Sequence, residues 1–383
     1  MTADLYLNDK KDNAKMLLTI NTGKKKNAIT DSYKDIVNWL GEKNKIAALI
    51  PYMYDRNEFH GDFVFVIKEK FSLSNKPFAI FKAALLAFKI RGMLKPNNLK
   101  KIFIYFDNDY FNIFLTVFLA KTTVAYYVWM HDPELHSGEG HITKTVRAFN
   151  AKFLYKKAAK IFVSWEGAKK IVSSSYGIDE QKIIPIKLPE LKSMQFSDIK
   201  PAPFDKCRYD LIFFGRIEEY KGIELLINSL LHLNSMSKKL KALIVGTGNI
   251  EKEILEKVKE NKNIVFINRY VPDRELAELI AASKIAVMPY KDATGTQAIQ
   301  VANFYNRPVI TSSKGCFPEY IENGVNGFVF EDYSITGLSK KIIELVDNEK
   351  LYKKIQSKIP SHFRKNFALK NVADKLEKEI KYF

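Results

Sequence analysis

Short apolar runs alternate along the chain with longer segments in which apolar residues recur every three or four positions. In the second half, this pattern predicts strands at 210–214, 240–245, 263–268, 285–288 and 307–311. It predicts helices that begin near Gly222, near Ile250 and at the N-cap candidate Asp273, and a helical run over 297–305. Strands that alternate with helices in this way predict a doubly wound parallel α/β sheet.

The first half of the chain has a less regular pattern. Its apolar runs predict strands at 16–21, 46–50, 63–68, 101–106, 124–130 and 160–164, with helix patterns between several of them. This half therefore favours a second, more divergent α/β domain. At 383 residues, the chain is long enough for two domains of ordinary size.

The loop after the strand at 210–214 has residues that suit a diphosphate. Gly215 allows a sharp turn, Arg216 presents a planar fork of donors, and Lys221 adds a mobile positive charge. A helix that begins at Gly222 would direct the positive end of its dipole to the same place. The plainer alternative is a solvated loop with two surface cations.

Three further loops follow strands of the same predicted sheet. They contain Gly246, the run Thr294-Gly295-Thr296-Gln297, and Glu319. Ligands bind such sheets at the carboxyl ends of the strands. We therefore expect these loops to share one edge with the loop of Gly215.

Six motifs of the second half occur in a characteristic order. They are Gly215-Arg216…Lys221-Gly222, Val245-Gly246-Thr247-Gly248, 270–276, Arg307-Pro308-Val309-Ile310, Pro318-Glu319-Tyr320-Ile321 and 322–328. In this order they resemble the donor-binding domain of the retaining glycosyltransferases of family 4. That family has the GT-B fold, in which two Rossmann-like, doubly wound domains face a central cleft.

The resemblance also implies a division of the chain into functional parts. Residues 1–188 would be an N-terminal acceptor-binding domain, and 189–203 a linker. Residues 204–362 would be the C-terminal nucleotide-sugar-binding domain. The last helix, in 363–383, would pack back on the N-terminal domain.

The activity implied by the resemblance is transfer of a sugar, with retention, from a nucleotide-sugar donor to a glycan or lipid-linked glycan acceptor. The implied setting is the biosynthesis of lipopolysaccharide, capsule or exopolysaccharide. Arg216 and Lys221 would be catalytic, because they would hold the diphosphate and stabilise the charge on the leaving group. Gly215, Gly246 and Glu319 would bind the donor. Protein cations replace a metal in the resembled family, so we expect no metal and no other cofactor.

One segment departs from the family pattern. The family usually has two glutamates eight residues apart, and counting back from Pro308 places them at Ala293 and Val301. The segment resembles a subgroup with an alanine-threonine loop, which makes 294–297 the donor-binding candidates. Two alternatives stay open: the threonines only cap a helix, or the activity has been lost.

A polar loop follows the predicted strand at 124–130. Its start resembles a pattern found in some family members, which makes His131 and Asp132 catalytic candidates and His136 and Glu139 candidates for acceptor binding. A zinc site is less favoured, because the loop has no His-Glu-x-x-His spacing. A plain structural turn at Asp132 and the following proline is the other alternative.

Positive charge is concentrated in the first half of the chain. The net charge is +18, and residues 1–200 hold 32 Lys and Arg against 20 Asp and Glu, or +12. Basic, aromatic-rich helix patterns at 76–91 and 144–157 suit an anionic membrane surface. Ordinary core-facing helices with a solvated lysine face would give the same pattern.

Cysteine usage and the apolar runs indicate a compartment. Cys207 and Cys316 have neither disulfide nor metal spacing. The sequence has no signal-peptide pattern and no run long enough to span a membrane. The expected location is the cytoplasm, with a peripheral position on the inner face of the cell membrane.

Two other functions explain part of these observations. A nucleotide-sugar epimerase with the GT-B fold would have the same donor loops. A basic nucleic-acid-binding protein would explain the charge, but the chain has no nucleic-acid recognition motif, and we expect no nucleic-acid partner.

Overall fold

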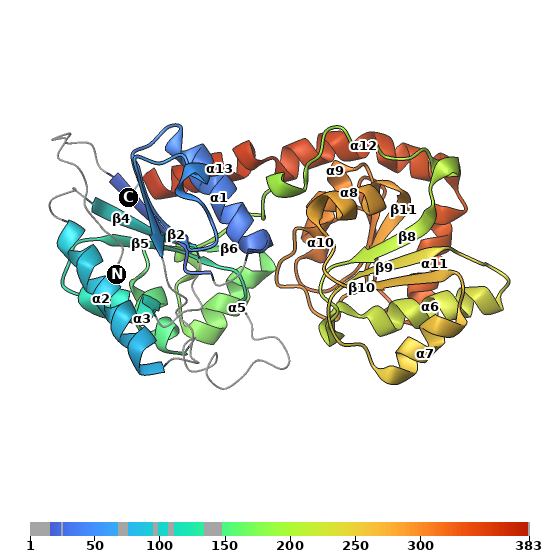
Figure 1. Ribbon diagram of the computed structural model, residues 1–383, viewed down its shortest axis with the longest axis horizontal. Coiled ribbons are helices and arrows are strands. Elements are labelled where there is room, and N and C mark those ends of the chain that lie inside the picture. Colours follow the sequence, from blue (N-terminus) through green and yellow to red (C-terminus); the bar gives the residue numbers. More distant parts are fainter. Residues whose placement is uncertain are drawn as a thin grey trace. The chain divides into compact units, whose positions relative to one another are not determined.

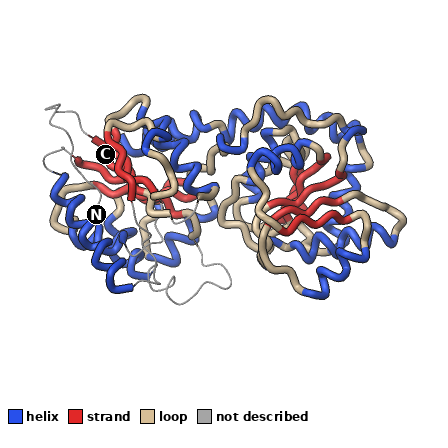
Figure 2. The backbone as a smooth tube through the Cα atoms, viewed as in Figure 1, coloured by secondary structure: helices blue, strands red, loops and turns tan. Residues whose placement is uncertain are grey.

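The computed structural model describes residues 16–23, 26–67, 76–94, 99–105, 111–133 and 148–381. The chain divides into two compact units. The first unit contains the chain up to Lys187 together with the segment from Leu369 onward, and the second runs from Leu188 to Ala368. Each unit has a central sheet with helices around it (Figure 2).

The first unit is built on a seven-stranded sheet in the order β3-β2-β1-β4-β5-β6-β7, and all of its described strand pairs are parallel. Its strands are β1 (Met16–Ile20), β2 (Ile46–Pro51), β3 (Phe63–Ile67), β4 (Leu99–Ile104), β5 (Ala125–Met130), β6 (Lys160–Val163) and β7 (Ile183–Pro185). The strand order reverses between β1 and β4, which lie side by side: β2 and β3 extend the sheet on one side, and β5 to β7 extend it on the other. Their carboxyl ends therefore mark the position where a doubly wound sheet binds ligands.

Helices cover both faces of this sheet (Figure 1). They are α1 (Ala28–Gly41), α2 (Lys76–Leu94), α3 (Phe111–Phe118), α5 (Gly167–Tyr176) and α13 (Leu369–Lys381), with short helical segments η1 (Arg56–Glu58), η3 (Ala151–Tyr155) and η4 (Glu180–Lys182). Apolar residues of α2, α3 and α5 pack on alternate strand residues such as Leu18 and Ile102, which forms the main core. The expected helix pattern at 144–157 lies partly outside the described residues, and its described part, 148–157, is helical and includes η3.

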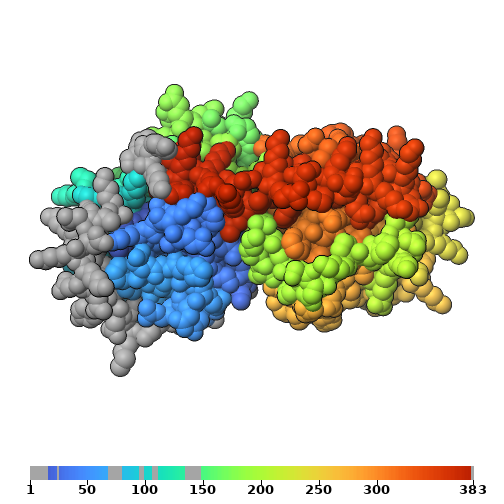
Figure 3. Space-filling model, turned by 90° about the horizontal axis from the view of Figure 1, so that it is seen from above, coloured from blue at the N-terminus to red at the C-terminus, as the bar shows by residue number. Residues whose placement is uncertain are grey.

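The C-terminal segment α13 packs on the first unit. Asn44 Nδ2 donates to Glu377 Oε1 at 3.0 Å, and Lys43 forms an ion pair with Asp374 at 3.2 Å. Lys160 pairs with Glu379. Figure 3 shows the residues of α13 (red) beside those of α1 (blue). The segment expected as one final helix from 363 is divided, because α12 ends at Phe367 and α13 begins at Leu369.

The second unit has six strands in the order β10-β9-β8-β11-β12-β13, again with parallel pairs throughout. Its strands are β8 (Tyr209–Phe214), β9 (Ala242–Gly246), β10 (Ile264–Asn268), β11 (Ser283–Met288), β12 (Val309–Ser312) and β13 (Gly327–Phe330). Its helices are α6 (Ile223–Ser235), α7 (Lys252–Glu260), α8 (Asp273–Ala281), α9 (Ala298–Phe304), α10 (Phe317–Tyr320), α11 (Ile335–Val346) and α12 (Glu349–Phe367). The two units confirm the doubly wound α/β class, and the expected strands agree with the observed ones to within two residues.

One local expectation needs correction, and the expected linker has defined contacts. Asp273 is the first residue of α8, because Pro272 occupies the N-cap position with an extended backbone. The segment 189–203, expected as a linker, packs on the second unit. The Ala202 N–H donates to the Ala281 carbonyl at 2.9 Å, and the neighbouring Leu188 N–H donates to Tyr320 Oη at 2.8 Å. Within the described ranges, no helix is long and apolar enough to cross a membrane.

Candidate active site

The loops expected to share an edge do meet at the carboxyl end of the second sheet. The order of strands changes direction between β8 and β11, so the loops after these two strands are neighbours at the switch point. The loop of Gly246 is also close, since a Cβ added to this glycine would lie 1.7 Å from the Gly215 carbonyl oxygen. The Ile217 N–H donates to the Thr247 carbonyl at 2.8 Å, which joins the two loops.

Gly222 fixes the start of α6 against the loop after β11. Its φ is +66°, a left-handed conformation, and an added Cβ would lie 1.8 Å from the Pro289 carbonyl oxygen. Tyr333 Oη donates to the same carbonyl at 2.8 Å. The Lys291 N–H donates to the Tyr220 carbonyl at 2.7 Å. These contacts hold the Lys221 backbone against the loop from the neighbouring strand.

Two tyrosines surround the ammonium group of Lys221. Its Nζ lies 3.9 Å from the ring centroid of Tyr290 and 4.8 Å from that of Tyr220. Burial lowers the pKa of Lys221, and the nearby Arg216 acts in the same direction. The electron-rich ring faces attract a cation, so the structure positions this ammonium group although no carboxylate is close enough to form an ion pair with it among the described residues.

Arg216 lies at the same strand end but is open to solvent. Its side chain is 70% exposed, and its Nη1 forms an ion pair with Glu218 at 2.8 Å. Nη2 is 3.5 Å from Tyr220 Oη. A guanidinium held in this way keeps donors available to an anion that reaches the edge of the sheet.

The alanine-threonine loop joins the same cluster through Tyr290. A hydrogen bond links the Thr296 side chain with the Tyr290 phenol, whose pKa is raised by burial. Thr296 Oγ1 also accepts from the Ala298 N–H at 3.2 Å, although the N-cap residue of α9 is Gln297. The Cys316 N–H donates to the Ala293 carbonyl at 2.9 Å and brings in the loop of Glu319, a half-buried residue in α10.

In the remaining part of this region, two glutamines bind the segment at 188–189. Thr294 is 5% exposed, and Gly295 is exposed. The Gln297 amide donates to the Pro189 carbonyl at 2.9 Å, and that of Gln300 to the Leu188 carbonyl at 2.9 Å. Gln297 therefore holds the segment that enters the second unit, a contact that the sequence pattern did not indicate.

In the first unit, His131 lies at the carboxyl end of β5. It is 8% exposed, its Nε2 is 2.9 Å from the Tyr105 carbonyl oxygen, and its ring stacks on Trp129. A carbonyl can only accept, so Nε2 carries the proton and Nδ1 is a hydrogen-bond acceptor. Burial lowers the pKa of His131 to about 4, against the opposing effect of Asp132. The imidazole is therefore neutral near pH 7, with Nδ1 able to accept a hydrogen bond.

The other candidates in this loop divide into two groups. Asp132 is half-buried and follows His131 directly. His136 and Glu139 lie outside the described residues. Within the described part of the chain, there is no group of three or more His, Cys, Asp or Glu side chains that could hold a metal ion.

Sequence reasoning missed a polar group at the switch point of the first sheet. Asn21 and Thr22 follow β1 directly and are 0% and 4% exposed. Among the described residues, Asn21 Nδ2 and Thr22 Oγ1 have no hydrogen-bond partner. Buried polar atoms are normally paired, and two such atoms at this edge indicate a place for a polar ligand. Their signal in the sequence was the change from an apolar run to Asn-Thr-Gly after Ile20.

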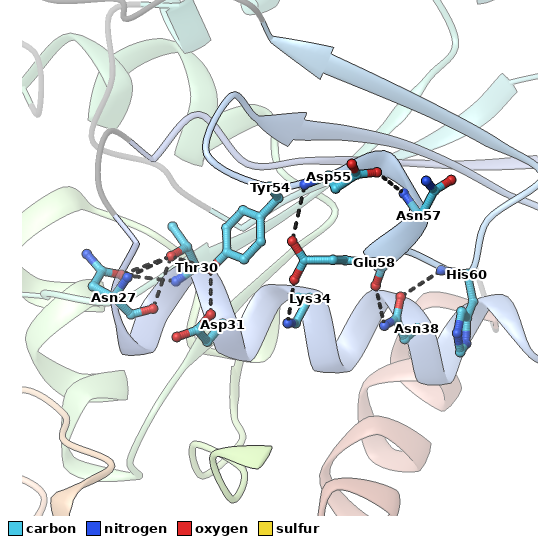
Figure 4. A network of polar contacts seen from close by, with 10 residues as sticks. All are labelled: Asn27, Thr30, Asp31, Lys34, Asn38, Tyr54, Asp55, Asn57, Glu58 and His60. Carbon is cyan, nitrogen blue, oxygen red and sulfur yellow. Dashed lines mark hydrogen bonds and ion pairs between the residues drawn. The ribbon is translucent and has the colours of Figure 1, made fainter. Parts of the chain in front are cut away.

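A hydrogen-bond network holds α1 close to this position (Figure 4). Tyr54 Oη donates to Asp31 Oδ1 at 2.6 Å and also contacts Thr30 Oγ1 at 2.9 Å. Lys34 pairs with Glu58 at 3.0 Å. Burial and the bond to Asp31 raise the pKa of Tyr54. The network ties the loop after β2 to the first turns of α1 and so fixes the helix end nearest to Asn21.

The neutral state of His131 gives a testable pH dependence. Its folded pKa of about 4 lies below the ordinary 6.5, so the unfolded chain takes up this proton first as the pH falls. As the pH falls from 6.5 to 4, protonation of His131 in the unfolded chain therefore lowers the free energy of unfolding, by at most about 1.4 kcal/mol per pH unit. The free energy of unfolding of wild type, measured relative to that of His131→Asn, should therefore decrease as the pH is lowered through this window. Histidine NMR should show a neutral ring with its proton on Nε2 at pH 6, and a charged ring at that pH would contradict the assignment.

Comparison with known proteins shows what this fold and its second unit are similar to. Residues 195–362 match the family model described as Glycosyl transferases group 1. HepE from Anabaena, solved with UDP and glucose, superposes with a TM-score of 0.72 at 15% identity, covering 97% of this chain and 100% of HepE. Sucrose-phosphate synthase from Thermosynechococcus elongatus gives 0.69 at 11% identity, covering 95% and 98%. The chain thus has a GT-B-like fold, and residues 195–362 are similar to the group 1 glycosyltransferases.

Two curated relatives have names that refer to a cps region or to capsular polysaccharide biosynthesis. An uncharacterized 41.2 kDa protein in the cps region of Klebsiella pneumoniae is 25% identical over 206 residues, which are 53% of this chain and 51% of that protein. The capsular polysaccharide biosynthesis glycosyltransferase CapM of Staphylococcus aureus is 24% identical over 276 residues, 67% of this chain and 72% of CapM. The chain spans about half the length of the Klebsiella relative.

Proposed function

We propose that this protein transfers a sugar from a uridine-diphosphate sugar to a glycan or lipid-linked glycan acceptor in the biosynthesis of a cell-surface polysaccharide. The observation that carries the proposal is the Lys221 ammonium group, held by two tyrosines beside Arg216 at the switch point of a group 1 glycosyltransferase domain. HepE binds UDP and UDP-glucose, which favours a uridine nucleotide. CapM and the cps-region relative favour a capsular acceptor.

The residues of the second unit have distinct tasks in this proposal. Lys221 and Arg216 bind the diphosphate and stabilise its charge as the bond to the sugar breaks. Tyr290 keeps the ammonium group in place and links it to Thr296. We assign the chain to the alanine-threonine-loop subgroup, in which the threonine loop takes the place of the two usual glutamates. Transfer with retention follows from the family.

The residues of the first unit would face the acceptor. His131 Nδ1 is an acceptor and can receive a hydroxyl hydrogen from a sugar. Asn21 and Thr22 supply buried donor groups at the neighbouring strand end. The acceptor contacts of His136 and Glu139 remain part of the proposal from sequence alone.

A panel of nucleotide sugars tests the proposal. We expect slow release of UDP from one uridine-diphosphate sugar and faster release when a capsular oligosaccharide is added. NMR of the product should show the anomeric configuration of the donor. Release of an epimerised sugar would identify an epimerase instead, and calorimetric binding of no nucleotide in the panel would refute the proposal.

The reaction is expected to proceed in EDTA. Two protein cations at the diphosphate supply the positive charge that stabilises a leaving phosphate. The initial rate in EDTA should stay within about twofold of the rate without it, since a charge already supplied by Arg216 and Lys221 needs no ion. Complete inhibition that manganese or magnesium reverses would show that the diphosphate needs a metal.

A further inference from the structure

The outer face of α2 has large apolar side chains that the described part of the chain leaves exposed. Phe81 is 63% exposed and Phe88 is 58% exposed, while Ala83, Ala87 and Ile90 on the opposite side are buried in the core. The helix is thus apolar on both its inner and its outer face. Helices of this kind are normally covered on all sides, by protein or by lipid.

A neighbouring helix extends this apolar face. α3 packs beside α2, with Phe118 against Phe88 at 5.9 Å between ring centroids. Val117 on α3 is 54% exposed, and Ile80 on α2 is 41% exposed. Contiguous exposed apolar side chains on a soluble unit mark a surface that binds a partner or a membrane.

The basic helix pattern predicted at 76–91 contains three cations near these phenylalanines, Lys82, Lys89 and Arg91. The structure distributes them over different sides of α2. Only Arg91 of the three is exposed on the outer face, one turn beyond Phe88, whereas Lys82 and Lys89 are half-buried on another side of the helix.

Arg91 belongs to a pocket that two other cations line. The pocket has a volume of about 650 Å³ and lies where α2 ends and β4 and β5 begin. Its described lining includes Phe88, Arg91, Lys100, Lys121, Thr122 and Thr123. We call Phe81, Phe88, Arg91, Lys100 and Lys121 together the α2 surface.

Acidic residues are absent from the described elements that carry this surface. The residues of α2, of β4 and of the stretch from α3 to the end of β5 (76–94, 99–104 and 111–130) contain no Asp or Glu, but they contain Lys76, Lys82, Lys89, Arg91, Lys100, Lys101 and Lys121. The next described acidic residue, Asp132, follows the end of β5, at the opposite edge of the sheet. Arg91, Lys100 and Lys121 are exposed, and within the described ranges none forms an ion pair. Three unneutralised cations around one pocket favour an anion.

We propose that the α2 surface binds an anionic phospholipid bilayer, with a lipid phosphate in the pocket and Phe81 and Phe88 in the boundary between headgroups and acyl chains. Charge complementarity selects the occupant: a phosphate fits the three cations, and the acyl boundary fits the two rings next to them. A neutral protein partner would leave the cations without a counter-charge.

The α2 surface is separate from the candidate active site within its own unit. The pocket lies where β4 and β5 begin, whereas Asn21 and His131 follow the ends of β1 and β5. Since the strands are parallel, these are opposite edges of one sheet. Lipid binding here leaves the ligand edge open, and it does not depend on which sugar the protein transfers.

Vesicle flotation tests the proposal with the full chain. Wild type should bind vesicles of phosphatidylcholine mixed with phosphatidylglycerol, bind pure phosphatidylcholine weakly, and release as NaCl is raised. The variant Arg91→Glu/Lys100→Glu/Lys121→Glu should lose more than about tenfold in vesicle affinity. Phe81→Ser/Phe88→Ser should lose affinity as well, although its charge is unchanged.

Matched controls separate this surface from general charge. Lys239→Glu/Lys262→Glu/Lys354→Glu changes the net charge equally at exposed residues of the second unit and should bind vesicles like wild type. Met236→Ser/Tyr270→Ser removes two exposed apolar side chains of that unit and should also bind normally. Affinity for UDP should be the same in all variants, which keeps this test independent of the proposed function.

Three outcomes would overturn the proposal. They are wild type that ignores anionic vesicles at low salt, equal losses in the α2 triple variant and its control, and stronger binding to a random oligonucleotide than to the vesicles. The last result would assign the α2 surface to nucleic acid. A self-association that the phenylalanine variant abolishes, without vesicle binding, would assign it to a second copy of the chain.

Discussion

Replacing Lys221 with alanine is expected to lower turnover about 10²–10³-fold, which is the usual effect of removing a group that stabilises charge in the transition state. The ammonium group is already positioned over the Tyr290 ring at 3.9 Å before a donor binds. The alanine variant therefore loses a preorganised charge. Arg216→Ala should have a smaller effect, because the guanidinium is 70% exposed and is shared with Glu218.

The lowered pKa of Lys221 adds a second measurement. A diphosphate stabilises the charged ammonium group, so binding raises a pKa that burial holds below the ordinary value. Affinity for UDP should fall as the pH rises through the pKa of the free protein, with proton uptake on binding at the same pH. Calorimetry in two buffers with different ionisation enthalpies measures that uptake, which should vanish in Lys221→Ala.

A neighbouring lysine gives the control for this prediction. Lys291 follows Tyr290, is 41% exposed, and pairs with Glu219 at 3.1 Å. Lys291→Ala removes the same charge from the same loop cluster but should keep turnover and proton uptake close to wild type. If the two variants behave alike, Lys221 has no special role at the diphosphate.

The edge that gathers the donor loops could be predicted from the sequence. Each loop follows an apolar run, and parallel strands place their carboxyl ends together. The partners of Lys221 could not be predicted in this way. Tyr290 becomes its neighbour only because β11 pairs with β8, and the order of strands in a sheet is not written in the local pattern.

For Gln297 and His131, the sequence predicted the position in the fold but not the contacts of the side chain. Both were candidates because they lie in polar loops after strands, where functional residues collect. The Gln297 amide instead bonds to the Pro189 carbonyl, more than a hundred positions away, which periodicity cannot indicate. His131 is at the expected strand end, but its neutral state depends on burial beside Tyr105 and Trp129.

Which residues of α2 are exposed also depends on tertiary packing. The pattern predicted a helix over 76–91 that is rich in phenylalanine, and the helix ends three residues later, but the pattern did not indicate which face meets the core. The structure places the small Ala83 and Ala87 inward and the large Phe81 and Phe88 outward. Close approach of α2 to the sheet favours small residues at the contact, which leaves the rings on the outside.

Gly222→Ala is expected to destabilise the second unit by about 2–5 kcal/mol, since the left-handed backbone costs about 1–2 kcal/mol for a residue with a Cβ and overpacking adds about 1–3. The Cβ would lie 1.8 Å from the Pro289 carbonyl oxygen and 2.7 Å from Tyr333 Oη. Neither atom can move freely, because they are bonded to each other at 2.8 Å. For a unit of this size the loss corresponds to a fall in Tm of about 5–15 °C.

Gly324→Ala separates the two causes of that loss. Gly324 also has a left-handed backbone, with φ at +74°, but nothing lies within 4 Å of its added Cβ. Its variant should therefore show only the backbone part, about 1–2 kcal/mol, and should bind UDP like wild type. Gly222→Ala should weaken UDP binding even well below its Tm, because the displaced helix start carries Lys221 with it. Equal Tm values and equal UDP affinities in the two variants would show that the contact with Pro289 does not position the site.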